Sequence, residues 1–175
     1  MNFIVKVVNS VDRASEWSGR AIAWLVLALV LLVCYDVAMR YLLQSGSIAL
    51  QELEWHLFAL IFLLSAAYTL KHDEHVRVDL LYGSRYFSDK HRAMVNLSGS
   101  LFLLIPFCIL IIYASWPFAA NAYAINEVSS DPGGLPYRFL IKAAIPLGFL
   151  LLLIQGIAEI GRNILILKQL SDVKE

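Results

Sequence analysis

Charged residues are scarce in this sequence. Asp, Glu, Lys and Arg make up only 16% of the 175 residues, whereas hydrophobic residues make up 59%, and the mean hydropathy is +0.68. Soluble domains contain about a quarter charged residues and about half apolar residues. A soluble protein is therefore excluded, and the composition predicts an integral membrane protein.

The sequence also lacks an excess of charge of either sign. It contains 14 basic and 14 acidic residues, and its formal net charge is zero. No basic cluster is interleaved with aromatic residues, which is the pattern that nucleic-acid-binding proteins present. Nucleic acid is therefore not expected as a partner.

Cysteine chemistry and common catalytic motifs are missing as well. The two cysteines, Cys34 and Cys108, both lie inside apolar runs, where a thiol behaves as a small hydrophobic group. We expect neither a disulfide nor a C-x-x-C site. Neither G-x-S-x-G nor H-E-x-x-H occurs, so no hydrolase motif is present and no enzyme activity is expected.

Histidines suggest two cofactor hypotheses, and the sequence favours neither. Only His56 lies near an apolar run, whereas a b-type haem held between helices needs two axial side chains. A second group clusters in the stretch KHDEHVRVDLL, from Lys71 to Leu81: His72, Asp73, Glu74, His75 and Asp79. Imidazole and carboxylate groups are zinc ligands, but the alternation in VRVD fixes no third ligand, so a solvated end of a membrane span is favoured over a metal site.

Four apolar runs approach the length that a membrane-spanning helix needs, which is about 20 residues. We predict one all-α membrane domain over residues 1–175, with spans at about 21–40, 52–70, 94–120 and 139–161. Pro106 and Pro117 are predicted kinks in the third span, and small residues such as Gly99, Gly148 and Gly156 are expected to permit close helix contacts.

The distribution of basic residues predicts the orientation of the spans. Eleven of the 14 Lys and Arg residues flank the span ends on the side of the two termini. Basic residues near span ends remain in the cytoplasm. Both termini are therefore expected to be cytoplasmic. The stretch NAYAINEVSSDPGGLPYR, 121–138, is expected to face the opposite compartment.

Two segments have the apolar spacing of amphipathic helices. Residues 1–18 carry apolar residues at helical spacing against charged ones, which predicts a helix lying in the membrane interface. The stretch IALQELEWHLF, 48–58, follows Ser45-Gly46-Ser47. We predict that it forms an amphipathic elbow in the membrane plane before the second span; the alternative is that it forms the first turns of that span.

Ionisable residues at the outer ends of the first two spans are candidates for structure or subunit contact. Asp36 and Arg40 are four residues apart, so they can form an ion pair along one helix face. Glu52 and Glu54 must point in different directions on a helix. One of them is expected to meet a partner, either Arg40 or a basic group of another subunit.

A second charged set surrounds the start of the fourth span. Arg138 and Lys142 share a helix face, and Glu127 and Asp131 lie in the preceding loop. Long basic side chains at span ends commonly extend toward the interface, and a docking patch for another protein is the alternative. The middle of each span is too apolar to form a path for a polar solute.

The motifs together resemble the small membrane subunit, the DctQ-like subunit, of tripartite ATP-independent periplasmic (TRAP) transporters. The resemblance rests on SIALQELEWHLFALIFLLSAAYTLKHDEHVRVDLLYG, on Arg40-Tyr41 upstream and on SSDPGGLPYRFLIKAAIPLGFLLLLIQGIAEI downstream, within residues 17–163. The positions of Arg40, Glu52, His75, Arg77 and Asp79 match the family pattern and are interpreted as structural or interface positions.

The resemblance implies a subunit without catalytic activity or cofactor in the bacterial inner membrane. Its partners would be a large elevator-type membrane subunit, a periplasmic substrate-binding protein and membrane lipids. A sodium gradient would drive import. The chain ends at SDVKE, so the large subunit is expected to be a separate polypeptide. The alternatives are a membrane-bound haem or metal redox subunit and a homo-oligomeric channel.

Overall fold

The computed structural model describes residues 2–74 and 88–172, with side chains from residue 4 to residue 171. The described residues form helices and connecting loops: α1 (Asn2–Leu42), α2 (Ile48–Lys71), α4 (Asp89–Gly99), the π-helical turn η1 (Ser100–Leu104), α5 (Ile105–Ala124) and α6 (Phe139–Asp172). Helices α4, η1 and α5 follow one another without a connecting loop. Within the described ranges, four helical segments are therefore long and apolar enough to cross a membrane, as the sequence predicts.

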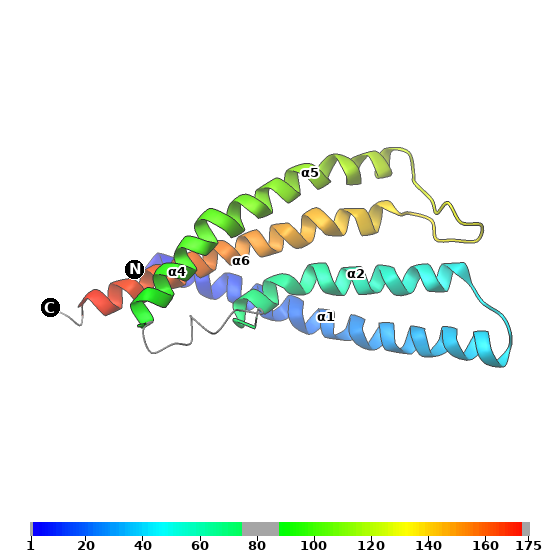
Figure 1. Ribbon diagram of the computed structural model, residues 1–175, viewed down its shortest axis with the longest axis horizontal. Coiled ribbons are helices and arrows are strands. Elements are labelled where there is room, and N and C mark those ends of the chain that lie inside the picture. Colours follow the sequence, from blue (N-terminus) through cyan, green and yellow to red (C-terminus); the bar gives the residue numbers. More distant parts are fainter. Residues whose placement is uncertain (1, 75–87, 173–175) are drawn as a thin grey trace.

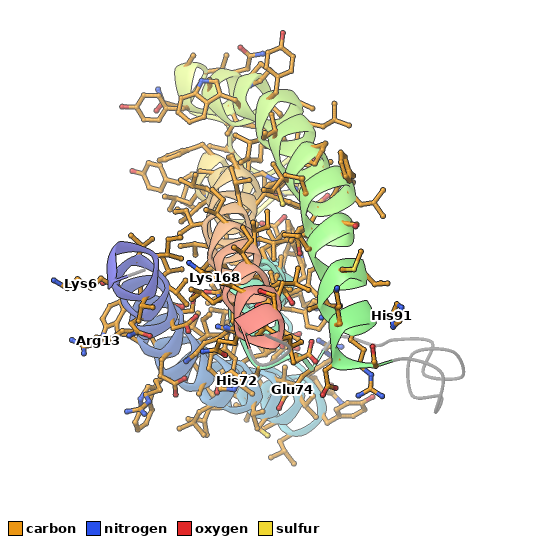
Figure 2. All side chains as sticks on the ribbon, turned by 90° about the vertical axis from the view of Figure 1, so that its left-hand side faces the viewer. Lys6, Arg13, His72, Glu74, His91 and Lys168 are labelled. Atoms are coloured by element: carbon orange, nitrogen blue, oxygen red, sulfur yellow. The ribbon has the colours of Figure 1, made fainter. Side chains whose placement is uncertain are left out.

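Helix α6 is the central element of the bundle. It contacts α5, α2, α1 and α4, and α1 also packs on α2. Both termini lie at one end, and the loops 43–47 and 125–138 lie at the other (Figure 1). We call the second end the loop end. Figure 2 looks onto the terminal end, where Lys6, Arg13 and Lys168 lie together with His72 and His91.

The exterior of the bundle is as apolar as its interior. The buried apolar side chains are mostly alanines, whereas large side chains such as Trp24, Leu31, Phe102 and Tyr113 are exposed. A helix that is hydrophobic all round is typical of a membrane span. The bundle therefore has the surface that a lipid environment or another apolar surface requires.

Small residues allow the helices to approach each other closely. A Cβ atom on Gly148 of α6 would lie 2.7 Å from the Leu63 carbonyl oxygen of α2, and one on Gly156 would lie 2.9 Å from Leu104 Cδ2. These two predicted contacts are confirmed. Gly99 is different, because a Cβ atom there would meet nothing within 4 Å, so the prediction of a close contact at Gly99 is wrong.

The first 18 residues do not form a separate interfacial helix. Residues 2–42 form one helix of 41 residues without a break, which is about 62 Å long. Val8 is buried, and its Cγ2 atom lies 3.2 Å from the Cβ position of Gly161 on α6. The apolar side of this segment therefore covers α6, which continues to Asp172 rather than ending near 161.

The segment 48–58 joins the second span without a break. Helix α2 runs from Ile48 to Lys71 and has Ser47 at its N-cap position. No Gly or Pro interrupts this stretch, so nothing separates an elbow from the helix. The predicted elbow is therefore not present as a separate element, and the stretch forms the first turns of α2, which was the alternative.

The third span contains a local defect at one of its predicted kinks. The π-helical turn Ser100–Leu104 ends two residues before Pro106. Proline has no N–H group to donate to the carbonyl of Phe102, and its ring would clash with that carbonyl. A wider turn relieves this conflict, and the chain changes direction between α4 and α5 (Figure 1). Pro117 lies inside α5 without such a turn.

Candidate functional site

Glu52 anchors the loop 125–138 to α2. Its side chain is buried, and its carboxylate accepts a hydrogen bond from Ser129 Oγ and another from the Leu135 N–H at 2.6 Å. These residues are separated from Glu52 by 77 and 83 positions in the sequence. Glu52 is therefore the one of the two glutamates that meets a partner, and this partner is the loop rather than Arg40.

The turn that carries the loop back to α6 depends on glycine at two positions. Gly133 has a φ of +80°, and the Gly134 N–H donates to the Asp131 carbonyl at 3.0 Å. Proline followed by a glycine of positive φ is the pattern of a type II turn. A Cβ atom on Gly134 would lie 2.4 Å from Ser129 Oγ and 2.9 Å from Glu52 Oε2, so a side chain there would displace the anchor.

A second set of contacts fixes the loop to α6. Lys142 Nζ donates to Glu127 Oε2 and lies 4.1 Å from the centre of the Phe118 ring. Both charged side chains are largely buried. The Arg138 N–H donates to the Glu127 carbonyl at 3.0 Å. The loop 125–138 is therefore held to α2, α5 and α6 at once.

The candidate docking residues differ in how much of their charge remains available. Glu127 and Lys142 neutralise each other. The Arg138 guanidinium lies over the Trp55 ring, 5.5 Å from its centroid. Asp131 is exposed, and only its main chain takes part in the turn. The pair of Glu127 and Lys142 thus holds the loop in its conformation, and the side chain of Asp131 lies on the loop surface.

The pair that the sequence predicts on α1 is present. The Arg40 guanidinium donates to Asp36 Oδ2, and Asp36 is only 1% exposed. The Arg40 side chain is 46% exposed, so the pair reaches the surface through the arginine. Asp36 Oδ1 and Glu54 Oε1 are buried and accept no hydrogen bond from any described residue.

The histidines of the cofactor hypotheses are engaged in local contacts or lie outside the described residues. His56 Nδ1 is 2.5 Å from the Glu52 carbonyl oxygen, and its ring packs on Trp55. His75, Arg77 and Asp79 lie outside the described residues. Within residues 2–74 and 88–172, no three His, Cys, Asp or Glu side chains gather as a metal site would require.

Charges at the terminal end of the bundle join α1 to α2. Glu16, which precedes the apolar run of α1, lies 2.6 Å from Lys71 Nζ and 3.2 Å from His72 Nε2. These hydrogen bonds lower the pKa of Glu16 to about 2, and the bond from Lys71 has the larger effect. The group KHDEH therefore begins with two residues that bind α1.

A polar network joins α1 to α6, and it was not predicted from the sequence. Ser15 Oγ donates to Gln155 Oε1 at 2.6 Å, and Gln155 Nε2 donates to Asp12 Oδ1 at 3.0 Å. Arg162 Nη2 donates to both Asp12 oxygens at 2.9 and 2.8 Å. Gln155 is completely buried. A signal was available in the sequence, because Gln155, Glu159 and Arg162 recur at helical spacing.

Asp12→Asn is expected to weaken this network. The substitution removes the negative charge and one of the two oxygens that accept from Arg162, and the partial exposure of both side chains limits the loss of stability to about 1 kcal/mol. The midpoint of thermal unfolding measures this loss. Asp89→Asn is the control, because Asp89 is 80% exposed and 3.7 Å from Arg92. Equal midpoints for the two variants would contradict a structural role for the network.

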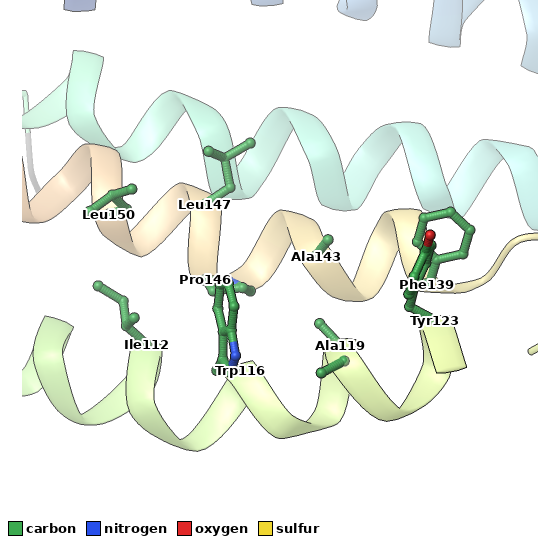
Figure 3. A pocket seen from close by; sticks show the side chains of 10 residues that line it. Ile112, Trp116, Ala119, Tyr123, Phe139, Ala143, Pro146, Leu147 and Leu150 are labelled. Atoms are coloured by element: carbon green, nitrogen blue, oxygen red, sulfur yellow. The ribbon is translucent and has the colours of Figure 1, made fainter. Parts of the chain in front are cut away.

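An apolar groove lies between α5 and α6. Its volume is about 430 Å³, and Trp116 faces Pro146 across it while Tyr123 packs edge-on against Phe139 (Figure 3). Its lining consists of apolar and aromatic side chains. Such a surface offers no set of polar groups for a hydrophilic solute.

The chain matches one protein family. The family model described as "Tripartite ATP-independent periplasmic transporters, DctQ component" matches residues 29–165. The match includes α2, α4, η1 and α5, and most of α6. No curated protein matches the chain.

Proposed function

This chain belongs to the family of DctQ components of tripartite ATP-independent periplasmic transporters, and we propose that it supports the large subunit of a sodium-driven solute importer. DctQ components are non-catalytic subunits, and a tripartite transporter implies other components. In this proposal the large, separate membrane subunit moves as an elevator in the bacterial inner membrane. The small subunit holds the static part of the large one and helps to dock a periplasmic substrate-binding protein.

The observation that carries the proposal is the lack of a polar path through the described bundle. The buried polar side chains Ser15, Gln155 and Asn163 bind groups of the chain itself. Glu52 is likewise occupied by the loop. A transporter acting alone needs free polar groups near the middle of the membrane, and these side chains are not free.

The exposed apolar surface supports a scaffold role. Helices α1 and α5 turn large apolar and aromatic side chains outward, and contacts through glycine and the polar network fix α6 against its neighbours. In the membrane, a partner helix gains from close packing rather than from a hydrophobic driving force. Arg40, whose side chain is 46% exposed at the loop end, is a candidate for the contact with the large subunit, and the buried Asp36 holds it in place.

The orientation proposed for the subunit places the loop 125–138 in the periplasm. Basic residues surround the terminal end, among them Lys6, Arg13 and Lys168 (Figure 2), and this distribution favours a cytoplasmic position. The loop then faces the compartment of the binding protein. Asp131 supplies an exposed charge there, and Glu127, Arg138 and Lys142 shape the surface around it.

Deletion of this subunit tests the function. Cells that contain the large subunit and the binding protein but not this chain are expected to lose sodium-driven uptake, and the purified large subunit is expected to lose its partner in mild detergent. Supplying the chain from a plasmid should restore both.

Liposomes that contain this chain alone provide the opposing measurement. No solute flux is expected, because the bundle would lack its transport subunit. Flux through the chain alone, or full uptake in the deletion strain, would refute the proposed function.

A further inference from the structure

A second groove combines an apolar floor with two cations at its mouth. It lies at the loop end, between α2 and α5 and above α6, and has a volume of about 430 Å³. Its apolar walls come from all three helices, and they include Ala59, Phe62, Phe118, Ile141 and Ile145. Arg138 and Lys142 line the same groove.

The two cations differ in what they can still bind. Lys142 is neutralised by Glu127. The Arg138 charge acts on Glu52 from a distance, and its buried Nε atom has no hydrogen-bond partner among the described residues. The guanidinium is held over the Trp55 ring. Arg138 is therefore a fixed donor that can accept a partner from outside the described chain.

The groove continues from this donor toward the middle of the bundle. Ile141 and Ile145 follow Arg138 by three and seven residues on α6, so the apolar floor extends about 10 Å along the helix axis. Phe62 on the α2 wall is 70% exposed, which leaves the groove open to the surroundings of the bundle. An occupant must therefore offer an anionic acceptor at one end and hydrocarbon along the remainder.

We propose that this groove binds a membrane phospholipid. Its phosphate accepts hydrogen bonds from Arg138, since a guanidinium matches phosphate geometry and charge. One acyl chain lies between α2 and α5, on Ile141 and Ile145. A hydrophilic solute would leave the apolar floor without contact, and a hydrocarbon alone would leave Arg138 without an acceptor. This inference requires only that the chain spans a membrane, so it is independent of the scaffold role.

Phospholipid retention by the purified transporter complex provides the test. Native mass spectrometry during stepwise delipidation in detergent is expected to reveal one phospholipid that leaves last. Arg138→Gln should weaken its retention about tenfold, as the loss of one charged hydrogen-bonding partner predicts. Ala59→Phe, which fills the groove without a change in charge, should weaken it at least as much.

Arg20→Gln is the matched control, because it removes an arginine that is 78% exposed near the terminal end. It should retain the phospholipid as the wild type does. Comigration of the subunits on gel filtration establishes that each variant still assembles. Equal retention by wild type, Arg138→Gln and Ala59→Phe would overturn the proposal, as would a wild type that retains no phospholipid.

A photoreactive amino acid at Phe62 identifies the occupant directly. A phospholipid adduct on the peptide that contains residue 62 is the expected product. A cross-link to the large subunit in place of this adduct would overturn the proposal, because a protein surface would then fill the groove. Neither result depends on uptake, so the lipid site and the proposed function fail or succeed separately.

Discussion

Gly148→Val is expected to push α2 away from α6 and to prevent a stable transporter complex from forming. The first atom of the new side chain would lie 2.7 Å from the Leu63 carbonyl oxygen and 3.1 Å from the carbonyl carbon. Both are main-chain atoms, so no rotation of a flexible side chain can make room. Overpacking of this kind costs about 3 kcal/mol. Thermal unfolding of the purified protein and sodium-driven uptake should both record the loss.

Gly99→Val is the matched control for this experiment. Gly99 lies within the third span, as Gly148 lies within the fourth, but a Cβ atom at Gly99 would meet nothing within 4 Å. Valine is a slightly better helix former than glycine, so stability is expected to stay the same or to rise. If the two variants unfold at the same temperature, close contact between α2 and α6 does not determine stability.

Glu52→Ala is expected to detach the loop 125–138 from α2 while the bundle remains folded. The substitution leaves the Leu135 N–H and Ser129 without the acceptor that both now use. An unsatisfied buried donor costs about 2 kcal/mol, which corresponds to about 30-fold faster amide exchange in the loop if exchange follows local opening. Hydrogen-exchange mass spectrometry measures this rate. Weaker binding of the periplasmic binding protein should accompany it.

Glu52→Gln separates hydrogen bonding from charge at the same position. The glutamine oxygen can accept from the Leu135 N–H, and its amide group can donate to Ser129 Oγ, because a hydroxyl group both donates and accepts. We therefore expect exchange in the loop close to that of the wild type. Slow exchange in Glu52→Ala would contradict the anchoring role, and fast exchange in both variants would show that the charge itself is required.

The apolar pattern of the sequence predicts the spans well and the helix ends poorly. The start of the fourth helix at Phe139 agrees with the prediction, but the helix continues past 161 to Asp172. Charged residues mark where hydrocarbon must end rather than where a helix ends. Glu159 and Arg162 lie within the helix, where their charges are paired: Asn163 donates to Glu159, and Arg162 donates to Asp12.

Site residues are predictable when their partners are close in the sequence. Asp36 and Arg40 are four positions apart, and helical geometry alone brings them together. Glu52 meets Leu135 across 83 positions, and no periodicity contains that information. The contact requires the packing of α2 beside α6, which the sequence pattern does not specify.

The length of α1 has a consequence for the space beside the membrane. A helix of 41 residues is about 62 Å long, whereas the hydrocarbon layer is about 30 Å thick. Tilt in the usual range of up to about 40° cannot hide the difference. Because Asp12 binds Arg162 of α6, we expect the surplus length of α1 to pair with the end of α6 and to project beyond the hydrocarbon layer. A probe fused to the N-terminus would therefore report a fixed height above the bilayer.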